Sequence, residues 1–264
     1  MTLRQHGSCQ DGLIHQAGTS AAVWNIGGVF IKVKAWRSEM QLEGDTIRFV
    51  NDLVPSLPTP TVLYSWVDAQ WSRSFLILGP VIGRTLHQAW DTLSSCSRTE
   101  LANTVARFCK ALAISTSARL ETVGGKGIVE PFLTAPPAIF EPSWKPQFLG
   151  PYSLEQLQPY LAETLATAAI APFALYHADL GPRNILVNDD GNLIAIIDWE
   201  SAAFYPIFWL GTKPLVSPGF LLPNGNRGAW ANLLTKALEG QGFVSDIESY
   251  STWKKMISEK TNSI

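Results

Sequence analysis

The stretch of residues 176–200 constrains the fold of this chain most strongly, because it sets polar side chains at the ends of two short apolar runs. The runs, residues 185–187 and 193–197, flank the sequence Asn-Asp-Asp-Gly-Asn. Apolar runs on either side of an Asp-Gly turn predict a β-hairpin. A hairpin brings its ends together, so Asn184, before the first strand, and Asp198, after the second, are expected side by side.

The oxygen atoms of these two side chains are candidates for binding a metal ion. Mg²⁺ takes one or two protein oxygens and fills its other positions with water and phosphate, so the paired ends of the hairpin suit it. Asp179 precedes Asn184 by five residues, on the loop that enters the hairpin. A carboxylate there is placed to accept a proton from a hydroxyl that approaches a metal-bound phosphate.

The sequence of this stretch also resembles a known family. The strings H-A-D-L-G-P-R-N, from His177 to Asn184, and I-D-W-E, ending at Glu200, are similar to the catalytic loop and metal segment of the aminoglycoside phosphotransferase and choline kinase-like family. Members of that family are relatives of protein kinases. The Asp-Trp-Glu sequence followed by Phe-Tyr-Pro at residues 204–206 is most similar to the fungal branch.

The resemblance implies a role for each polar residue. Asp179 would be the catalytic base, Asn184 and Asp198 would hold Mg²⁺, and His177 would orient the loop. Catalysis in such enzymes consists mainly of positioning the transferred phosphoryl group and neutralising its charge. Arg183 would contact that group or form a structural salt bridge.

Glu200 has two interpretations, since it would support the metal or pair with a nearby cation. The composition of residues 131–152 and 204–220, which are rich in aromatic residues, favours an apolar or aromatic acceptor over a polycation.

Residues 12–34 predict a three-stranded antiparallel meander, with Gly27-Gly28 as a two-residue hairpin turn. The preceding turn, with Thr19 and Ser20, occupies the place of the kinase phosphate loop. It lacks a G-x-G-x-x-G sequence. The resemblance implies that its hydroxyl and backbone N–H groups contact phosphate, and the alternative is an ordinary polar turn.

Lys32 lies in the apolar run V-F-I-K, where burial of its ammonium requires a partner. It resembles the strand-three lysine of kinases, which binds nucleotide phosphates. Lys34 shares the same strand face and is the competing candidate. Residues 36–53 predict a helix in which Glu43 is expected to orient Lys32, with Glu39 as the alternative. Gly44 follows where the family usually has Ala.

The segment after this helix predicts strands at residues 62–67 and 75–78 and then an interlobe hinge at residues 79–83. By the resemblance, adenine would use the backbone C=O of Gly79 and the N–H of Val81. Residues 122–153 lack clear periodicity. Helices are expected at residues 102–120, 154–170, 230–239 and 245–257, and an extended segment at 212–218.

Composition excludes several classes of protein. The chain has 264 residues, 46% of them hydrophobic and 16% charged, which provides for an ordinary globular core. A net charge of −2 gives no general attraction to nucleic acid or membranes. The three cysteines show no C-x-x-C spacing, the start of the chain has no apolar signal region, and no run is long enough to span a membrane. These features predict a cytoplasmic protein.

We therefore expect an α+β, two-lobed protein-kinase-like fold. Its N-lobe, residues 1–80, would be an antiparallel sheet with one helix, and its C-lobe, residues 81–264, would be mostly helical. The predicted function is ATP-dependent, Mg²⁺-assisted phosphoryl transfer to the hydroxyl of a small molecule. The alternatives are a pseudokinase or binding module of the same fold, and a different reaction on a metabolite. The acceptor, the choice of ATP or GTP and the oligomeric state are not predicted.

Overall fold

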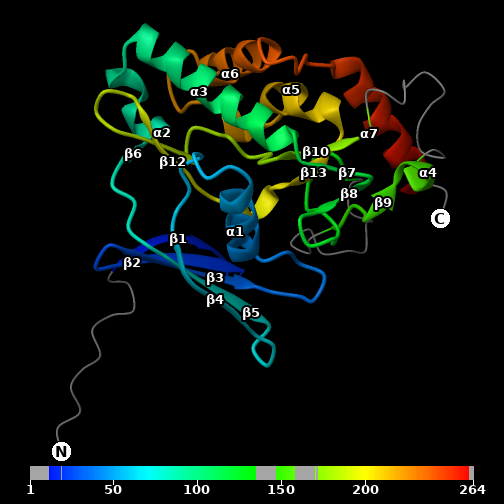
Figure 1. Ribbon diagram of the computed structural model, residues 1–264, viewed down its shortest axis with the longest axis horizontal. Coiled ribbons are helices and arrows are strands. Elements are labelled where there is room, and N and C mark those ends of the chain that lie inside the picture. The colour runs from blue at the N-terminus through cyan, green and yellow to red at the C-terminus, as the bar shows by residue number, and fades with distance from the viewer. Residues whose placement is uncertain (1–11, 19, 135–146, 158–169, 171, 262–264) are drawn as a thin grey trace, which may run out of the picture.

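The computed structural model describes residues 12–18, 20–134, 147–157, 170 and 172–261, and the side chains within these ranges as far as residue 256. Its first part is a five-stranded antiparallel sheet of order β1-β2-β3-β5-β4, with helix α1 packed beside it (Figure 1). The elements are β1 Leu13–Ala17, β2 Ala21–Ile26, β3 Val29–Ala35, α1 Glu43–Leu53, β4 Val62–Asp68 and β5 Arg73–Leu78.

The predicted meander of β1, β2 and β3 is confirmed. Gly27 and Gly28 form the turn between β2 and β3, with φ of 61° and 87°. Two successive positive φ angles are what a type I′ hairpin turn requires, and only glycine adopts them at low cost. The turn aligns β2 and β3 so that Lys32 lies opposite Val23 on one side and Leu76 of β5 on the other.

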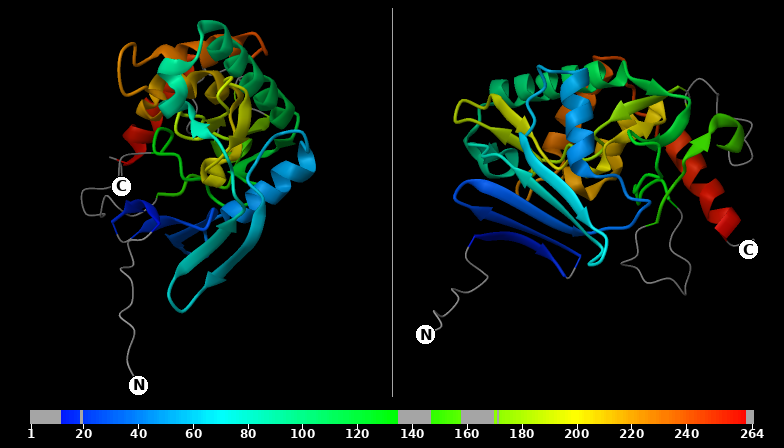
Figure 2. Two further views of the ribbon diagram at one scale, coloured as in Figure 1. Left: turned by 90° about the vertical axis from the view of Figure 1, so that its left-hand side faces the viewer. Right: turned by 60° about the horizontal axis from the view of Figure 1, so that its bottom comes forward.

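Helices predominate over strands in the described residues after β5, which lie on one side of this sheet (Figures 1 and 2). Helices α3, α5 and α6 pack together and carry much of the apolar core. The helical elements are α2 Leu86–Ala89, η1 Trp90–Thr92, α3 Ser95–Ala113, α4 Leu154–Leu157, η4 Trp199–Ser201, α5 Ile207–Val216, η5 Pro218–Phe220, α6 Ala229–Glu239 and α7 Ile247–Thr261.

Two small sheets complete this part of the molecule, in the orders β7-β10-β13-β8-β9 and β12-β11-β6. Together with the five-stranded sheet and its helix they confirm the predicted α+β class. The boundary between lobes at residue 80 stays a prediction. The strands are β6 Arg84–Thr85, β7 Thr116–Ser117, β8 Arg119–Thr122, β9 Tyr152–Ser153, β10 Phe173–Tyr176, β11 Ile185–Val187, β12 Leu193–Ile196 and β13 Ala203–Tyr205.

Several element boundaries differ from the prediction. Helix α1 begins at Glu43 and residues 36–42 form a loop, held in part by contacts to Lys126 that are remote in sequence. The helix predicted at 102–120 is α3, displaced toward the N-terminus. It ends at Ala113 because residues 116–122 form β7 and β8, which pair with β10 and β13.

The prediction of an extended segment at residues 212–218 is wrong, because the residues up to Val216 belong to helix α5. Pro214 lacks an N–H and so removes one helical hydrogen bond, which made a helix look unfavourable from the sequence. Burial of Phe208, Trp209 and Leu210 outweighs this local loss. Most of the helix predicted at 154–170, and part of the irregular segment 122–153, lie outside the described residues.

Within the described ranges, the helices are all too short or too polar to cross a membrane.

Gly44 tests the packing between α1 and the sheet. A Cβ at this position would lie 2.8 Å from the Oγ and 2.9 Å from the Cβ of Ser65 in β4. We expect Gly44→Ala to reduce the free energy of unfolding by about 1–3 kcal/mol, since overpacking outweighs its better helix propensity. Urea denaturation of Gly44→Ala, Ser65→Gly and the double variant measures this. The double variant should lose less unfolding free energy than the two single variants lose together, because the clash is removed. A Gly44→Ala variant that is more stable than wild type would contradict the account.

Candidate active site

The hairpin predicted around the Asp-Gly turn is confirmed and brings its two ends together. Strands β11 and β12 pair with Ile185 opposite Ile196. Beyond that pair, the N–H of Ile197 donates to the carbonyl of Asn184 at 2.9 Å. Asn184 and Asp198 therefore leave the hairpin at the same end.

Two residues at this end have left-handed backbone conformations that are unusual for non-glycine residues. Ala178, before Asp179, has a φ of 62°, and Asp198 has a φ of 66°. Such conformations cost about 1–3 kcal/mol each and persist only where the surroundings enforce them. They turn the backbone sharply at the two carboxylates of the site.

His177 holds the conformation of the loop from Ala178 to Asn184. Its ring is 1% exposed, its Nδ1 accepts from the N–H of Asp179 at 3.2 Å, and its Nε2 lies 3.1 Å from the carbonyl of Ile197. These contacts require a neutral ring with the proton on Nε2. Burial lowers the pKa of His177 to about 4, which keeps it neutral. His177 thus joins the loop to the strand that leads to Asp198.

The outer side of the same loop is also held. The carbonyl of Leu180 accepts from the buried Trp230 Nε1 at 2.9 Å, and that of Pro182 accepts from the N–H of His87 at 2.8 Å. Side chains and backbone from α6 and α2 thus fix the loop between Asp179 and Asn184. A loop held in this way presents its carboxylate in one position.

Asn184 fixes the Asp179 side chain directly. Its Nδ2 donates to the carbonyl of Asp179 at 2.9 Å and to Oδ2 at 2.7 Å. Because the amide N is used in this way, the Oδ1 of Asn184 is the atom left to face a cation. Burial, together with the negative charge of Asp198, raises the pKa of Asp179, while Lys213 and the Asn184 hydrogen bond oppose the rise. A raised carboxyl pKa favours proton acceptance.

Lys32 of β3 connects the five-stranded sheet to helix α1 and to the end of the β11–β12 hairpin. Its Nζ lies 2.7 Å from Glu43 Oε2 and 2.6 Å from Asp198 Oδ1. The other oxygen of Glu43, Oε1, accepts from the backbone N–H of Trp199 at 3.2 Å. Burial alone lowers the pKa of Lys32, but the carboxylates of Glu43 and Asp198 outweigh burial and raise it.

Asp198 responds to the same contact in the opposite sense. Burial raises its pKa, but the ammonium of Lys32 more than compensates, so the pKa of Asp198 is lowered. Both partners are therefore charged at neutral pH. A buried pair of this kind is stable only while both charges remain.

The structure distinguishes between the alternative residues. Glu43 contacts Lys32, whereas Glu39 is exposed. Lys34 forms an ion pair with Glu200. Burial, and then repulsion from Lys32, lowers the pKa of Lys34. Glu200 therefore pairs with the ammonium of Lys34, which is one of its two predicted roles.

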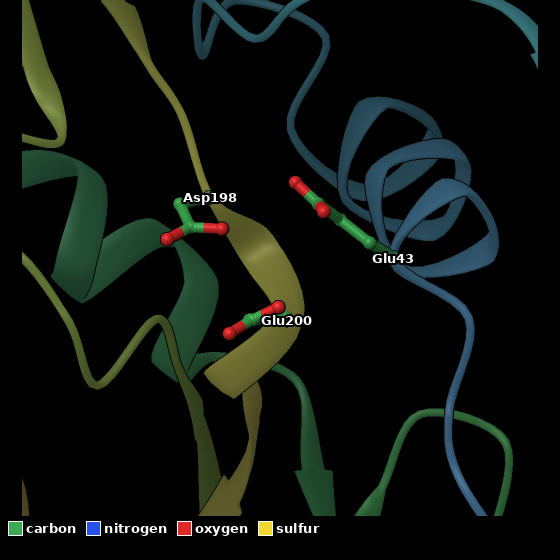
Figure 3. Close-up of side chains that lie close together, drawn as sticks. All are labelled: Glu43, Asp198 and Glu200. Atoms are coloured by element: carbon green, nitrogen blue, oxygen red, sulfur yellow. The ribbon is translucent and has the colours of Figure 1, made fainter. Parts of the chain in front are cut away.

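Figure 3 shows how the carboxylates of Glu43, Asp198 and Glu200 converge from α1 and from the segment after β12. One oxygen from each lies within 4.8 Å of the others. Lys32 and Lys34 form ion pairs with all three carboxylates and offset two of their three negative charges. Asn184 uses only its Nδ2 in the contacts described above, and Lys32 contacts only Oδ1 of Asp198. Asn184 Oδ1 and Asp198 Oδ2 therefore remain as hard oxygen ligands of the kind that Mg²⁺ requires, so the residues fit the ion.

The other predicted contacts lie on the sheet and after it. Thr19 falls outside the described residues. Ser20 is exposed at the β1–β2 turn, and its N–H donates to Ala17. Gly79 is buried and donates its N–H to Thr61 at 2.8 Å, while Val81 is half-buried two residues further on.

Arg183 is exposed and forms no ion pair within the part of the chain that the structure describes. Its position is therefore not explained by a salt bridge to any described residue.

One pair of functional interest was missed. Lys213 Nζ lies 2.7 and 2.6 Å from the two oxygens of Glu130, and both side chains are buried. The rings of Phe132 and Trp209 lie 4.5 and 5.3 Å from the same ammonium. The contact between Lys213 and Phe132 thus joins the two aromatic-rich stretches of the sequence. The signal was available, since Lys213 is the one charged residue between positions 202 and 216.

Comparison with known proteins identifies the family. A model of the phosphotransferase enzyme family, APH, matches residues 31–209, more than half of the chain. The chain belongs to this family. Residues of the hairpin, Lys32 and Glu43 all lie within the matched region. The search of curated proteins gave no match.

Solved structures of family members share the fold. An aminoglycoside-3'-phosphotransferase of type VIII aligns with a TM-score of 0.55 at 15% identity, over 93% of each chain. The aminoglycoside phosphotransferase APH(3'')-Id from Streptomyces rimosus gives 0.54 at 19% identity, over 93% of this chain and 92% of that one. Aminoglycoside 2'-phosphotransferase-IIIa gives 0.52 at 15% identity, over 92% and 80%. The predicted kinase-like fold is confirmed.

The buried His177 predicts a specific dependence of stability on pH. Its pKa falls from the ordinary 6.5 to about 4 on folding, so between these values the unfolded chain binds the extra proton. The contribution of the neutral His177 to the stability of the folded state is complete above pH 6.5 and is lost as the pH falls toward 4. Relative to His177→Gln, we expect wild type to lose roughly 3 kcal/mol of unfolding free energy over this range. Parallel pH profiles in urea denaturation would contradict the buried neutral ring.

Proposed function

We propose that this chain is an ATP-dependent phosphotransferase that acts on the hydroxyl of a small molecule. The observation that carries the proposal is the double contact of Lys32, which joins Glu43 of α1 to Asp198 after the hairpin. Packing alone does not explain three buried or half-buried charges from three elements, because each is costly without its partners. Membership of the phosphotransferase family supports the same conclusion.

Lys32 changes partner in this proposal. Nucleotide phosphates take the place of the Asp198 carboxylate next to Lys32 Nζ, while Glu43 keeps the ammonium in position. Asp198 and Asn184 are then the residues that would hold Mg²⁺, which would neutralise the phosphate charge. Lys34 and Glu200 flank this position as a paired cation and anion.

Asp179 accepts the proton of the acceptor hydroxyl as the hydroxyl oxygen bonds to the γ-phosphorus, while the bond from that phosphorus to the bridging oxygen of ATP breaks and ADP leaves. Asn184 donates to Oδ2 of this carboxylate, which leaves Oδ1 of Asp179 for the acceptor hydroxyl. Arg183, exposed on the same loop, contacts the transferred phosphoryl group. The neutral His177 keeps the loop in the required conformation.

The nucleotide base lies against the strand end at Gly79 and Val81, and the phosphates extend toward the turn with Thr19 and Ser20. The solved structure of aminoglycoside 2'-phosphotransferase-IIIa contains GDP. Both ATP and GTP therefore belong in the first binding experiments, with ATP as the proposed donor.

The acceptor is proposed to be an apolar or aromatic metabolite with a free hydroxyl. The named relatives act on aminoglycosides. Here the ammonium of Lys213 already occupies the space between Glu130, Phe132 and Trp209, which disfavours a polycation beside it. The relation to the fungal branch and the cytoplasmic location are part of the same proposal.

A binding module without phosphoryl transfer is the second candidate. The turn before β2 lacks the glycine-rich sequence of a kinase phosphate loop, which favours it. Lys32, Glu43, Asp179, Asn184 and Asp198 all keep the side chains that transfer requires, which favours the enzyme.

Replacement of Asp179 separates the two candidates. We expect a panel of hydroxylated aromatic and apolar metabolites to include one that stimulates ADP formation and gains the mass of a phosphoryl group. Asp179→Asn should lower that rate by about 10²–10⁴-fold with little loss of Mg²⁺-ATP binding, because only the proton acceptor is removed. Asp190→Asn, an exposed change in the same hairpin, is the control. A rate within tenfold of wild type in Asp179→Asn would show that Asp179 is not the base.

A further inference from the structure

The tight turn at residues 122–126 makes a contact that the proposed mechanism does not use. Its T-V-G-G-K sequence ends in Lys126, whose Nζ donates to the carbonyls of Ser38 and Met40 at 2.8 and 2.9 Å. The two carbonyls belong to the loop between β3 and α1. A lysine from the mostly helical part of the molecule thus binds the backbone that leads into the helix of Glu43.

The turn that carries Lys126 is itself fixed. The N–H of Thr122 donates to the carbonyl of Lys126 at 2.8 Å, and the N–H of Lys126 donates to Thr122 Oγ1 at 2.9 Å. Thr122 is the last residue of β8 and pairs with Ala203 of β13. Strand β13 follows Asp198 and Trp199 along the chain. Lys126 is therefore anchored to the segment that carries the proposed metal ligand.

The loop on the other side ends directly at Glu43. Its residue Gln41 accepts from Thr122 Oγ1 at 3.3 Å, which adds a second contact to the turn. Leu42, the N-cap of α1, provides no side-chain cap. The start of α1, and with it Glu43, therefore depends on the contacts of this loop. Glu43 in turn contacts Lys32 and Trp199.

Apolar packing does not replace these polar contacts. A pocket of about 290 Å³ lies between the start of α1 and the turn. Leu42, Asp45 and Phe49 line it on one side, and Val123, Gly124 and Lys126 on the other. Beside this space, the hydrogen bonds of Lys126 and the contact between Gln41 and Thr122 connect the two walls.

We propose that Lys126 is a positioning residue that holds Glu43 at Lys32 and so prepares Lys32 for the nucleotide. The contacts form a closed ring: Lys126 holds the loop, the loop places Glu43, Glu43 binds the N–H of Trp199, and the chain from Trp199 returns through β13 and β8 to Lys126. The part of this proposal that concerns nucleotide rests on the proposed function. The part that concerns Glu43 does not.

The test is a double-mutant cycle in the full chain between Lys126→Met and Glu43→Gln, with the affinity for Mg²⁺-ATP measured by calorimetry. We expect Lys126→Met to weaken binding about tenfold and the double variant to bind as Glu43→Gln does, because both changes act through the same contact. Lys126→Arg, which keeps donors for both carbonyls, should restore the affinity to within about twofold. Lys110→Met, an exposed lysine on α3, is the matched control.

Hydrogen exchange at the N–H of Trp199 provides a readout that needs no nucleotide. Lys126→Met should speed this exchange, as should Glu43→Ala, which removes the acceptor of this N–H, while Lys110→Met should not. Thr122→Val, which removes the hydroxyl bound to Gln41 and to the turn, serves as a second variant should Lys126→Met fail to fold. Its Trp199 exchange should also rise.

Additive losses of affinity, or unchanged Trp199 exchange in a folded variant, would overturn the positioning role. If wild type does not bind Mg²⁺-ATP, the proposed function fails, and faster Trp199 exchange in the Lys126 variant still supports the role of Lys126 toward Glu43.

Discussion

The double ion pair of Lys32 is the interaction on which the rest of this structure depends. An ammonium in a largely buried position is stable only with partners, and here both partners come from outside its own strand. Glu43 comes from α1 and Asp198 from the end of the β11–β12 hairpin. The sheet, the helix and the hairpin are therefore held in one arrangement by a single cation, and this is also the group that a nucleotide would engage.

The surroundings of this ion pair keep the catalytic loop in place. Ala178 and Asp198 have left-handed conformations that other contacts must enforce. His177 supplies two of these contacts because burial keeps its ring neutral, and the ring of Trp199 packs edge-on against it at 4.5 Å. Rigid support of this kind matters for phosphoryl transfer, in which the protein contributes mainly position and charge. The loop is thus prepared before any ligand arrives.

A feature of this structure is predictable from the sequence when the residues that determine it are close together along the chain. The hairpin of β11 and β12, the Gly27-Gly28 turn and the meander follow from residues that are neighbours along the chain, and all three were predictable. Helix α5 was not, because the burial of Trp209 and its neighbours outweighs the local effect of Pro214. The Glu130–Lys213 pair and the contacts of Lys126 span more than eighty residues, so the local pattern that identifies the site does not reveal what positions it.

The central claim is that Asp198 passes from Lys32 to a nucleotide-bound cation. The most direct measurement is calorimetric titration of ATP with and without Mg²⁺ into wild type and Asp198→Asn, with Asp190→Asn as the matched control. The account predicts Mg²⁺-dependent binding in wild type and in the control, and a loss of about 100-fold or more in Asp198→Asn, because a direct ligand contributes at least as much as its supporting contacts. Equal Mg²⁺-dependent affinity in Asp198→Asn would contradict it.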